Sequence, residues 1–165
     1  KYKFTLQLDL AKMQKELGDE YIILLRTHYF IADVLDLSEY EGFAYNLSKY
    51  DDIARLYLIS DVLITDYSSV FFDYANLRRP MLFFTYDLEK YRSVLRGFYI
   101  DVEEELPGPM LMTTDEVIGA LQNIENIVTE YSDKYTAFCD KYCAWEDGTA
   151  AKKVVETVFS DKSNK

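Results

Sequence analysis

The sequence predicts an α/β domain built on a parallel sheet of the Rossmann-like type. Short runs of branched apolar residues alternate with segments that repeat apolar residues at helical spacing, most clearly between Ile59 and Phe84. There, a strand Val62 to Ile64 and a polar turn lead into a helix Tyr67 to Leu77, and a second strand, Met81 to Phe84, follows. Short connections on either side of a helix make the second strand a parallel neighbour of the first.

Composition indicates one globular domain over residues 1–165. A chain of 165 residues with 49% hydrophobic and 16% aromatic residues can bury a sizeable core, and we find no repeat or linker inside it. The net charge of -11 excludes nucleic acid as an expected partner. No apolar run approaches the length of a membrane span, so we expect no direct membrane insertion from this segment. Because the first residue is Lys rather than Met, we expect a fragment of a longer protein.

The first third of the chain is predicted to alternate helix and strand. A helix over Asp9 to Leu17 leads into the strand Tyr21 to Leu25. A mixed acidic segment then loops over the surface before a short strand, Gly42 to Tyr45. Asp51 and Asp52 stand in the first turn of a helix through Ile59, where acidic side chains favour the helix dipole.

The last third is predicted to be helices that cover the sheet. We expect a charged loop from Glu103 to Pro109, closed by Pro-Gly-Pro, and then a Thr-x-x-Glu capping box at Thr113 that opens a helix to about Asn123. One longer helical stretch follows over Ile124 to Tyr142.

A final helix is predicted over Ala150 to Phe159, with Val154, Val155 and Val158 facing inward.

The chain has two cysteines, Cys139 and Cys143. They are spaced i, i+4, with no second Cys pair or nearby His to complete a zinc site. Two thiols do not make a disulfide framework, so we expect a reducing cytoplasm.

The polar turn after the strand Val62 to Ile64 is the first candidate site. Ligands of parallel sheets bind at the carboxyl ends of strands, and a helix start offers free backbone N–H groups to a phosphate. The turn supplies four polar side chains, those of Thr65, Asp66, Ser68 and Ser69. The alternative is that Ser68 or Ser69 merely caps the following helix, because Ser is among the commonest N-caps.

Two further places carry candidate site residues. Arg26 and His28, the one His of the chain, directly follow the strand Tyr21 to Leu25, where ligands gather. A lone His is usually structural or simply exposed, but the position of His28 after an apolar strand, two residues from Arg26, makes a functional role equally consistent with the sequence. Residues 86–99 hold mixed charges, including Arg96, that could line a cleft; a solvated surface is the alternative.

Several separated motifs, in order, resemble the CDP-glycerol glycerophosphotransferase family, whose members build teichoic acids. The first is Arg-x-His after a strand, and the longest is Ser-Asp-Val-Leu-Ile-Thr-Asp-Tyr-Ser-Ser up to Ser69. Arg79-Pro80, Arg96-Gly-Phe-Tyr, Pro107-Gly-Pro and Asp147-Gly-Thr-Ala complete the likeness, which covers nearly the whole chain. Tyr29 and Phe30 depart from the turn that follows Arg-x-His in some members.

The resemblance implies the carboxyl-terminal, nucleotide-binding half of a two-domain GT-B enzyme. Such an enzyme transfers glycerol phosphate from CDP-glycerol to a lipid-linked polymer acceptor and releases CMP, and the acceptor half is missing from this chain. The family pattern assigns the donor diphosphate to Arg26, Thr65, Asp66, Ser68 and Ser69, and the chemical step to His28. Asp73 and Arg96 are possible cleft residues. The full-length enzyme is expected in the cytoplasm, peripheral to the membrane.

Other functions remain open at this point. The donor could be another CDP-polyol or a nucleotide sugar, or the domain could bind a nucleotide without catalysis; a flavodoxin-like signalling receiver fits the position of the acidic residues less well. Asp66 and Asp73 could hold a divalent ion, but no clustered ligand set demands one, so no metal and no cofactor beyond the substrate are predicted.

Overall fold

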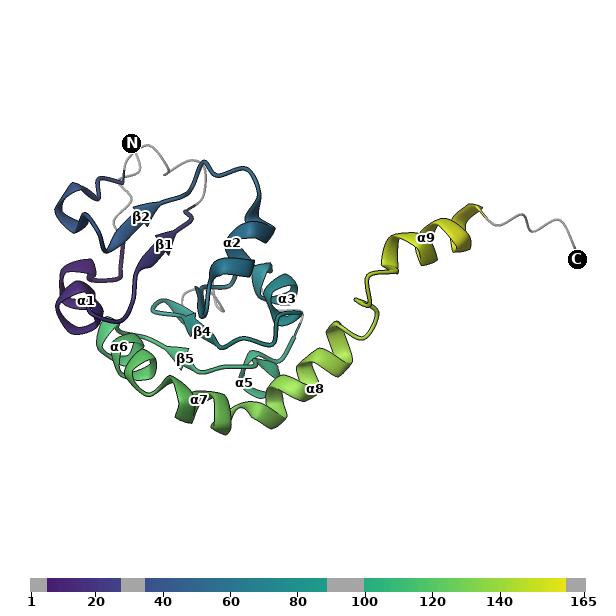
Figure 1. Cartoon of the computed structure of the whole chain (residues 1–165). Helices are drawn as coiled ribbons and strands as arrows, with labels where there is room; N and C mark the ends of the chain where they lie inside the picture. The colour runs from purple at the N-terminus through teal and green to yellow at the C-terminus, as the bar shows by residue number, and fades with distance from the viewer. Residues whose placement is uncertain (1–5, 28–34, 89–99, 160–165) are drawn as a thin grey trace, which may run out of the picture.

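The computed structural model of the chain describes residues 6–27, 35–88 and 100–159, and it confirms the predicted α/β fold (Figure 1). Its strands form two sheets in which every pairing is parallel. In one sheet β1 (Ile23–Leu25) pairs with β2 (Ala44–Asn46). The other has the order β3-β4-β5, made of Leu63–Thr65, Met81–Phe84 and Met110–Leu111.

The helices lie around these sheets. In chain order the helical elements are α1 (Leu10–Leu17), the 3-10 helix η1 (Ser38–Tyr40), α2 (Ile53–Ile59), α3 (Val70–Ala75), α5 (Val102–Glu105), α6 (Thr114–Gln122), α7 (Ile124–Glu130), α8 (Ser132–Tyr142) and α9 (Ala150–Phe159). Side-chain caps define the starts of several helices, and one of them, at Thr113, was predicted. The Asp52 side chain accepts the Ala54 N–H, and Thr113 with Glu116 forms the expected capping box.

Strand β4 is buried on both faces and divides the core into two clusters. Successive side chains of a strand point to opposite faces, so Leu82 and Phe84 join one cluster and Met81 and Phe83 the other. All four are 8% exposed or less. Burial on both faces is the usual condition of strands in parallel sheets.

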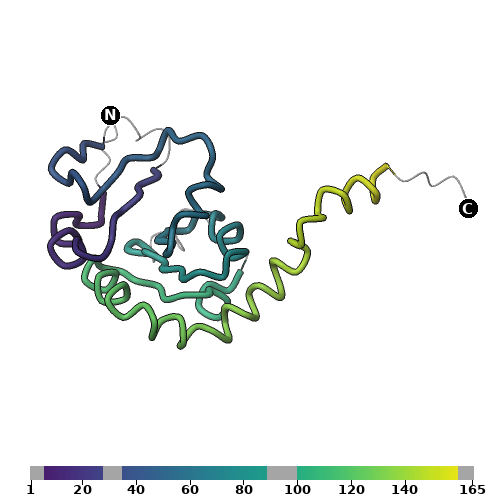
Figure 2. Tube along the Cα trace, viewed as in Figure 1, coloured from purple at the N-terminus to yellow at the C-terminus, as the bar shows by residue number. Residues whose placement is uncertain are grey.

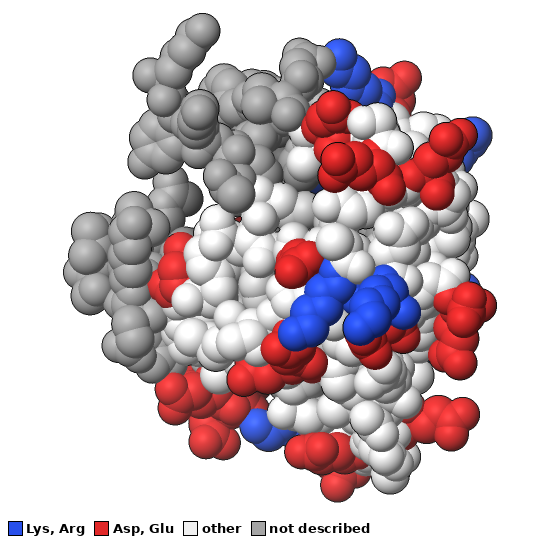
Figure 3. Space-filling view, turned by 90° about the vertical axis from the view of Figure 1, so that its left-hand side faces the viewer, with Lys and Arg blue, Asp and Glu red and all other residues white. Residues whose placement is uncertain are grey.

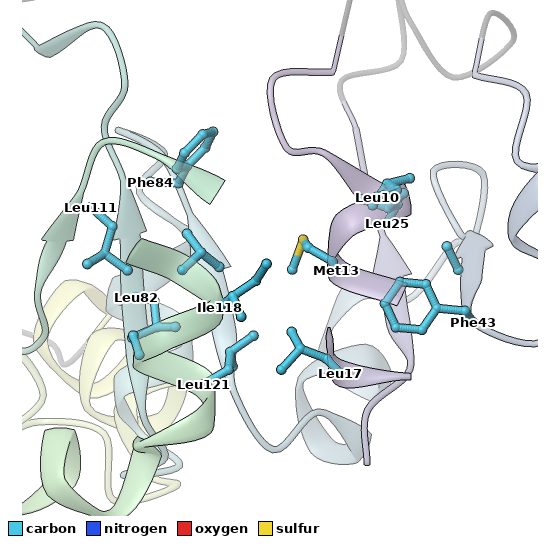
Figure 4. Packing of buried hydrophobic residues seen from close by; sticks show 13 residues of the cluster. Leu10, Met13, Leu17, Leu25, Phe43, Leu82, Phe84, Leu111, Ile118 and Leu121 are labelled. Atoms are coloured by element: carbon cyan, nitrogen blue, oxygen red, sulfur yellow. The ribbon is translucent and has the colours of Figure 1, made fainter. Parts of the chain in front are cut away.

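Helices α1 and α6 cover the first face. Figure 4 shows Met13 and Leu17 of α1 pointing toward Ile118 and Leu121 of α6. The contact also has a polar margin, because the Asp9 N–H donates to the Thr114 hydroxyl oxygen at 3.0 Å.

Helices α3, α5 and α8 form the second cluster with β4. It is mainly aromatic: the ring of Phe71 lies 5.4 Å from that of Phe83 and 5.7 Å from that of Phe138. Contacts of this geometry stabilise a core beyond the area that they bury. Cys139 is buried in this cluster, Cys143 is half-buried, and both are free thiols.

Helix α9 corrects one prediction. It extends away from the rest of the molecule (Figure 2), and Val154, Val155 and Val158 are 61%, 54% and 64% exposed. The prediction that they face inward is wrong, because periodicity identifies an apolar face without showing that a described part of the chain covers it.

Four other element predictions also need correction. The helix expected from Tyr67 begins at Val70, and the stretch expected as one helix over Ile124 to Tyr142 breaks at Tyr131. The expected loop over Glu103 to Pro109 instead begins inside helix α5 and leads directly into strand β5. Asp51 and Asp52 were predicted in the first turn of α2, but the helix begins at Ile53, and Asp52 is its N-cap.

Candidate functional site

The carboxyl ends of β3, β4 and β5 lie at one edge of the three-stranded sheet because the strands are parallel. Besides Met112, which follows β5, two segments leave the sheet at this edge: the turn Thr65 to Ser69 after β3 and the segment Thr85 to Asp87 after β4. We call these two segments the carboxyl-end site. Ligands of parallel α/β sheets bind at such an edge.

The turn after β3 leaves two serine hydroxyls available. The Asp66 carboxylate accepts the Ser68 N–H at 3.0 Å, so an acidic side chain closes the turn. Ser69 occupies the position before α3, but its side chain makes no cap hydrogen bond. In the described part of the chain neither Ser68 nor Ser69 has a hydrogen-bond partner for its hydroxyl. The capping alternative therefore does not account for the two serines.

A side-chain hydrogen bond joins the two segments of the site. The Tyr67 O–H donates to the Asp87 carboxylate at 3.0 Å. Burial, followed by the hydrogen bond to Asp87, raises the pKa of Tyr67 far above its ordinary value of 10.0, so the phenol is protonated at neutral pH. Sequence reasoning included Asp87 only in a general cleft-lining segment and missed Tyr67, because their pairing spans 20 residues.

The segment after β4 also presents an aromatic ring. Tyr86 is 47% exposed and its ring centroid lies 5.4 Å from that of Phe84. Partial burial raises the pKa of Tyr86, and the charges of Asp87 and Asp66 raise it further. The phenol of Tyr86 thus lies within electrostatic reach of both carboxylates of the site. Thr85 is buried beneath it, and its N–H donates to the Leu111 carbonyl at 2.8 Å.

Arg26 lies at the end of the other sheet, after β1. Its guanidinium donates to the backbone carbonyls of Tyr50 at 2.5 Å and Leu47 at 3.4 Å, so it holds the turn after β2. The side chain is exposed and keeps further donors for a ligand. The neighbouring Thr27 bonds Ser48 through both its N–H and its hydroxyl, at 3.0 and 2.9 Å.

The charges of Arg26 and of Asp73 in α3 both affect the pKa of Tyr57 in α2. Burial raises the pKa of Tyr57, the charge of Asp73 raises it further, and the charge of Arg26 lowers it. Asp73 is exposed in the first turn of α3, beyond the Thr65 to Ser69 turn. The predicted residues His28 and Arg96 lie outside the described residues.

The charge of the described surface is mainly acidic. Figure 3 shows one face on which acidic side chains spread around the margins, while a small group of basic side chains lies near the middle. Within residues 6–27, 35–88 and 100–159, no three His, Cys, Asp or Glu side chains are grouped so that they could hold a metal ion. Across these same ranges no helix has both the length and the apolar character needed to cross a membrane.

A separate cavity of about 190 Å³ lies at the opposite edge of the sheet. Pro80 and Met81, at the start of β4, form part of its wall, and Tyr131 and Tyr135 form another part. It therefore does not belong to the carboxyl-end site.

Comparison with known proteins gives a family match over nearly all of the chain. A sequence model of the family described as CDP-glycerol:poly(glycerophosphate) glycerophosphotransferase matches residues 1–160. The chain is 54% identical over 159 residues to the teichoic acid poly(glycerol phosphate) polymerase of Bacillus subtilis (strain 168). A teichoic acid poly(ribitol-phosphate) polymerase of Bacillus spizizenii (strain ATCC 23059 / NRRL B-14472 / W23) is 39% identical over 153 residues, which is 92% of this chain and 24% of that protein.

Solved structures agree with these matches. The wall teichoic acid polymerase TagF superposes on the chain with a TM-score of 0.87 at 47% identity, covering 97% of this chain and 39% of the polymerase. A variant of the same polymerase, soaked with CDPG, superposes equally well. The Bacillus subtilis match covers 96% of this chain but 21% of that polymerase, so the chain spans about a fifth of its length.

Proposed function

Because this chain belongs to the CDP-glycerol:poly(glycerophosphate) glycerophosphotransferase family, we propose that it is the donor-binding half of a GT-B-type enzyme. The enzyme transfers glycerol phosphate from CDP-glycerol to a growing teichoic-acid-type polymer and releases CMP. The observation that carries the proposal is the pair of serine hydroxyls at the carboxyl end of β3, which have no hydrogen-bond partner among the described residues, in a chain that superposes on TagF at a TM-score of 0.87.

Each residue of the site has a proposed role toward the donor. The hydroxyls of Thr65, Ser68 and Ser69 donate to diphosphate oxygens, and Arg26 supplies positive charge. Asp66 fixes the turn through the Ser68 N–H, so it positions the donor site and need not contact the phosphates. Placing hydrogen-bond donors where charge develops is the main contribution that a protein makes to phosphoryl transfer.

The reaction forms one phosphoester bond and breaks one phosphoanhydride bond. An acceptor hydroxyl attacks the phosphorus that carries glycerol, the bond from this phosphorus to the bridging oxygen breaks, and CMP leaves. We assign His28 to stabilise the transferring phosphate or to protonate the leaving group, because a histidine titrates near neutral pH. The base that takes the acceptor proton, the lipid-linked acceptor and the contact with the cytoplasmic face of the membrane belong to the remainder of the enzyme.

Titration calorimetry of this chain with CDP-glycerol, CDP-ribitol, CMP and a UDP-sugar tests the donor assignment. We expect CDP-glycerol to bind most tightly of the four, since identity to the glycerol-phosphate polymerase is 54% against 39% for the ribitol-phosphate polymerase. Tighter binding of CDP-ribitol would change the assigned polyol. Tighter binding of the UDP-sugar would contradict the family's reaction for this chain.

The double substitution Ser68→Ala with Ser69→Ala tests the site itself. Losing hydrogen bonds to a charged ligand should weaken CDP-glycerol binding by about 1 to 3 kcal/mol. A matched control is Thr129→Ala with Thr157→Ala, because both hydroxyls bond only to carbonyls of their own helices, at 2.9 and 2.7 Å. Unchanged affinity in a folded serine variant would remove the turn from the donor site.

The role of His28 is tested in a full-length enzyme that contains this chain. His28→Ala should lower kcat about 100-fold to 10,000-fold, the usual cost of losing a positioned acid or base. The donor Kd should change by less than about tenfold, because the interaction strengthens mainly in the transition state. Normal turnover at saturation with greatly weakened binding would make His28 a binding residue.

A further inference from the structure

The Tyr67–Asp87 hydrogen bond connects the two segments of the carboxyl-end site beyond the end of their backbone pairing. The last paired residues of β3 and β4 are Thr65 and Phe83, and the chains separate after them. Tyr67 lies in the middle of the turn, between Asp66 and Ser68, and its phenol reaches the segment after β4. Any movement of the turn away from β4 must therefore break or stretch this bond.

On its other side the turn leads into α3, whose buried residues Phe71, Tyr74 and Ala75 pack into the second cluster and do not include any residue of the turn itself. Helix α3, which follows it, has six residues, and the Asp66 bond to the Ser68 N–H is local to the turn. A short helix fixes few backbone groups, so the position of a preceding turn depends on its tertiary contacts.

The charge of Asp87 does not suit direct contact with an anionic donor. A carboxylate near a diphosphate repels it, and in a chain of net charge -11 no general positive field offsets that repulsion. A carboxylate is nevertheless a strong acceptor for a phenol O–H. The raised pKa of Tyr67 keeps the phenol protonated, so it remains the donor of this bond at neutral pH.

We propose that Asp87, acting through Tyr67, is a positioning residue that holds the turn Thr65 to Ser69 in the conformation that binds the donor diphosphate. This inference rests on the proposed function, because it assigns a role within the same site. A positioning role predicts that donor binding depends on the acceptor oxygen of Asp87 and not on its negative charge. A direct contact between Asp87 and the donor does not predict this.

Three variants distinguish a positioning role of Asp87 from a direct contact with the donor. The probe is CDP-glycerol, in titration calorimetry of this chain. Tyr67→Phe removes the donor oxygen, Asp87→Ala removes the acceptor, and Asp87→Asn keeps an acceptor oxygen without the charge. We expect the first two to weaken binding about 3-fold to 30-fold each, the range of one hydrogen bond. Asp87→Asn should bind within about 3-fold of the unmodified chain, or more tightly, because the repulsion is gone.

The combination of Tyr67→Phe with Asp87→Ala tests whether the two residues act as one unit. If they do, the double variant binds no more weakly than the weaker single variant. Tyr74→Phe is the matched control, since its O–H donates to the Ser60 carbonyl at 2.9 Å, before β3 and away from the carboxyl ends. It should lower the unfolding temperature and leave the donor Kd unchanged.

The outcomes distinguish failure of this inference from failure of the proposed function. If the unmodified chain binds CDP-glycerol and folded Tyr67→Phe binds it equally well, the positioning role is wrong while the function stands. Equal weakening by Asp87→Asn and Asp87→Ala would also overturn it, because the charge would then be the important property. If the unmodified chain does not bind CDP-glycerol, CDP or CMP, the proposed function fails and this inference fails with it.

Discussion

The hydroxyl of Tyr57 is buried and has no hydrogen-bond partner among the residues that the structure describes. Its ring is held by an edge-to-face contact with Tyr74 at 5.7 Å, and burial raises its pKa. A buried hydroxyl without a partner reduces stability, since it has lost its bonds to water. The charges of two candidate site residues also act on the pKa of Tyr57: Asp73 raises it and Arg26 lowers it.

Replacing Tyr57 by Phe should therefore leave the free energy of unfolding unchanged or raise it by about 1 kcal/mol, because the ring contact is kept and the unsatisfied oxygen is removed. Urea unfolding measures this change. Tyr74→Phe, which breaks a 2.9 Å hydrogen bond, should lower the same free energy by about 1 kcal/mol. A comparable loss in Tyr57→Phe would show that the Tyr57 hydroxyl has a partner in solution.

Glu105 should make stability depend on pH under acidic conditions. Its carboxylate accepts from Lys141 at 2.5 Å and from the Tyr142 O–H at 2.7 Å, and these bonds lower its pKa from 4.5 to about 2. A lowered pKa in the folded state gives stability that is complete above pH 4.5 and is lost as the pH falls toward 2.

Unfolding temperatures measured from neutral pH down to about pH 2 test this linkage. Glu105→Gln removes the titration, so its unfolding temperature should fall less than that of the unmodified chain over this interval. Glu104→Gln, on the same short helix, is the control, because the Glu104 side chain forms no ion pair within the described ranges. Parallel curves for the unmodified chain and Glu105→Gln would contradict the assignment.

At the scale of elements, Gly108 fixes the approach of β5 to β4. A Cβ atom at Gly108 would lie 1.9 Å from the Met81 carbonyl oxygen, and neither backbone can move without disturbing the Phe83 N–H bond to the Pro109 carbonyl at 2.9 Å. The requirement for Gly is therefore steric, and it explains the middle residue of the Pro-Gly-Pro sequence.

Gly108→Ala should lower the free energy of unfolding by about 3 kcal/mol or more, as overpacking against backbone does. Gly119→Ala is the matched control, because a Cβ there meets no atom within 4 Å and α6 gains a better helix former. It should raise the free energy of unfolding by about 0.5 to 1 kcal/mol. Equal effects of the two substitutions in urea unfolding would contradict the steric argument.

The sequence predicted those elements whose determinants are local. The Thr113 capping box and the strand Met81 to Phe84 were predicted because each depends on residues within a few positions. The break at Tyr131 was missed, since apolar spacing continues across it. Strand β5 was missed because its two residues are defined by pairing with β4 rather than by their own pattern.

The candidate site also has a part that could be predicted from the sequence and a part that could not. The turn after β3 was predicted from topology, because a polar turn at the carboxyl end of a parallel strand can be identified from sequence alone. Tyr67 and Asp87 were not paired in advance, since their bond depends on where two segments 20 residues apart meet in space. The exposed face of α9 could not be distinguished from a buried one by periodicity.

At the scale of the whole molecule, α9 contributes no residue to either core cluster, and its Lys153 contacts Asp147 and Trp145 of the segment that connects it to α8. It has no buried residue and extends from the end of α8. A chain that ends after Trp145 should therefore unfold within about 2 °C of the full 165 residues. Ending the chain after Tyr131 is the control, because it removes Phe138 and Cys139 from the core and should abolish cooperative unfolding. A large loss from the first truncation would show that α9 packs on the body in solution.

Because β4 contributes side chains to both core clusters, neither cluster can open without exposing one of its faces. In native-state hydrogen exchange, the amide protons of Leu82 and Phe83 should therefore exchange only when the entire domain unfolds. Amide protons of β1 and β2, which pair only with each other among the described strands, should exchange through smaller openings. The three-stranded sheet, together with the turn Thr65 to Ser69 that follows β3, would then remain intact during the fluctuations that expose the end of β1.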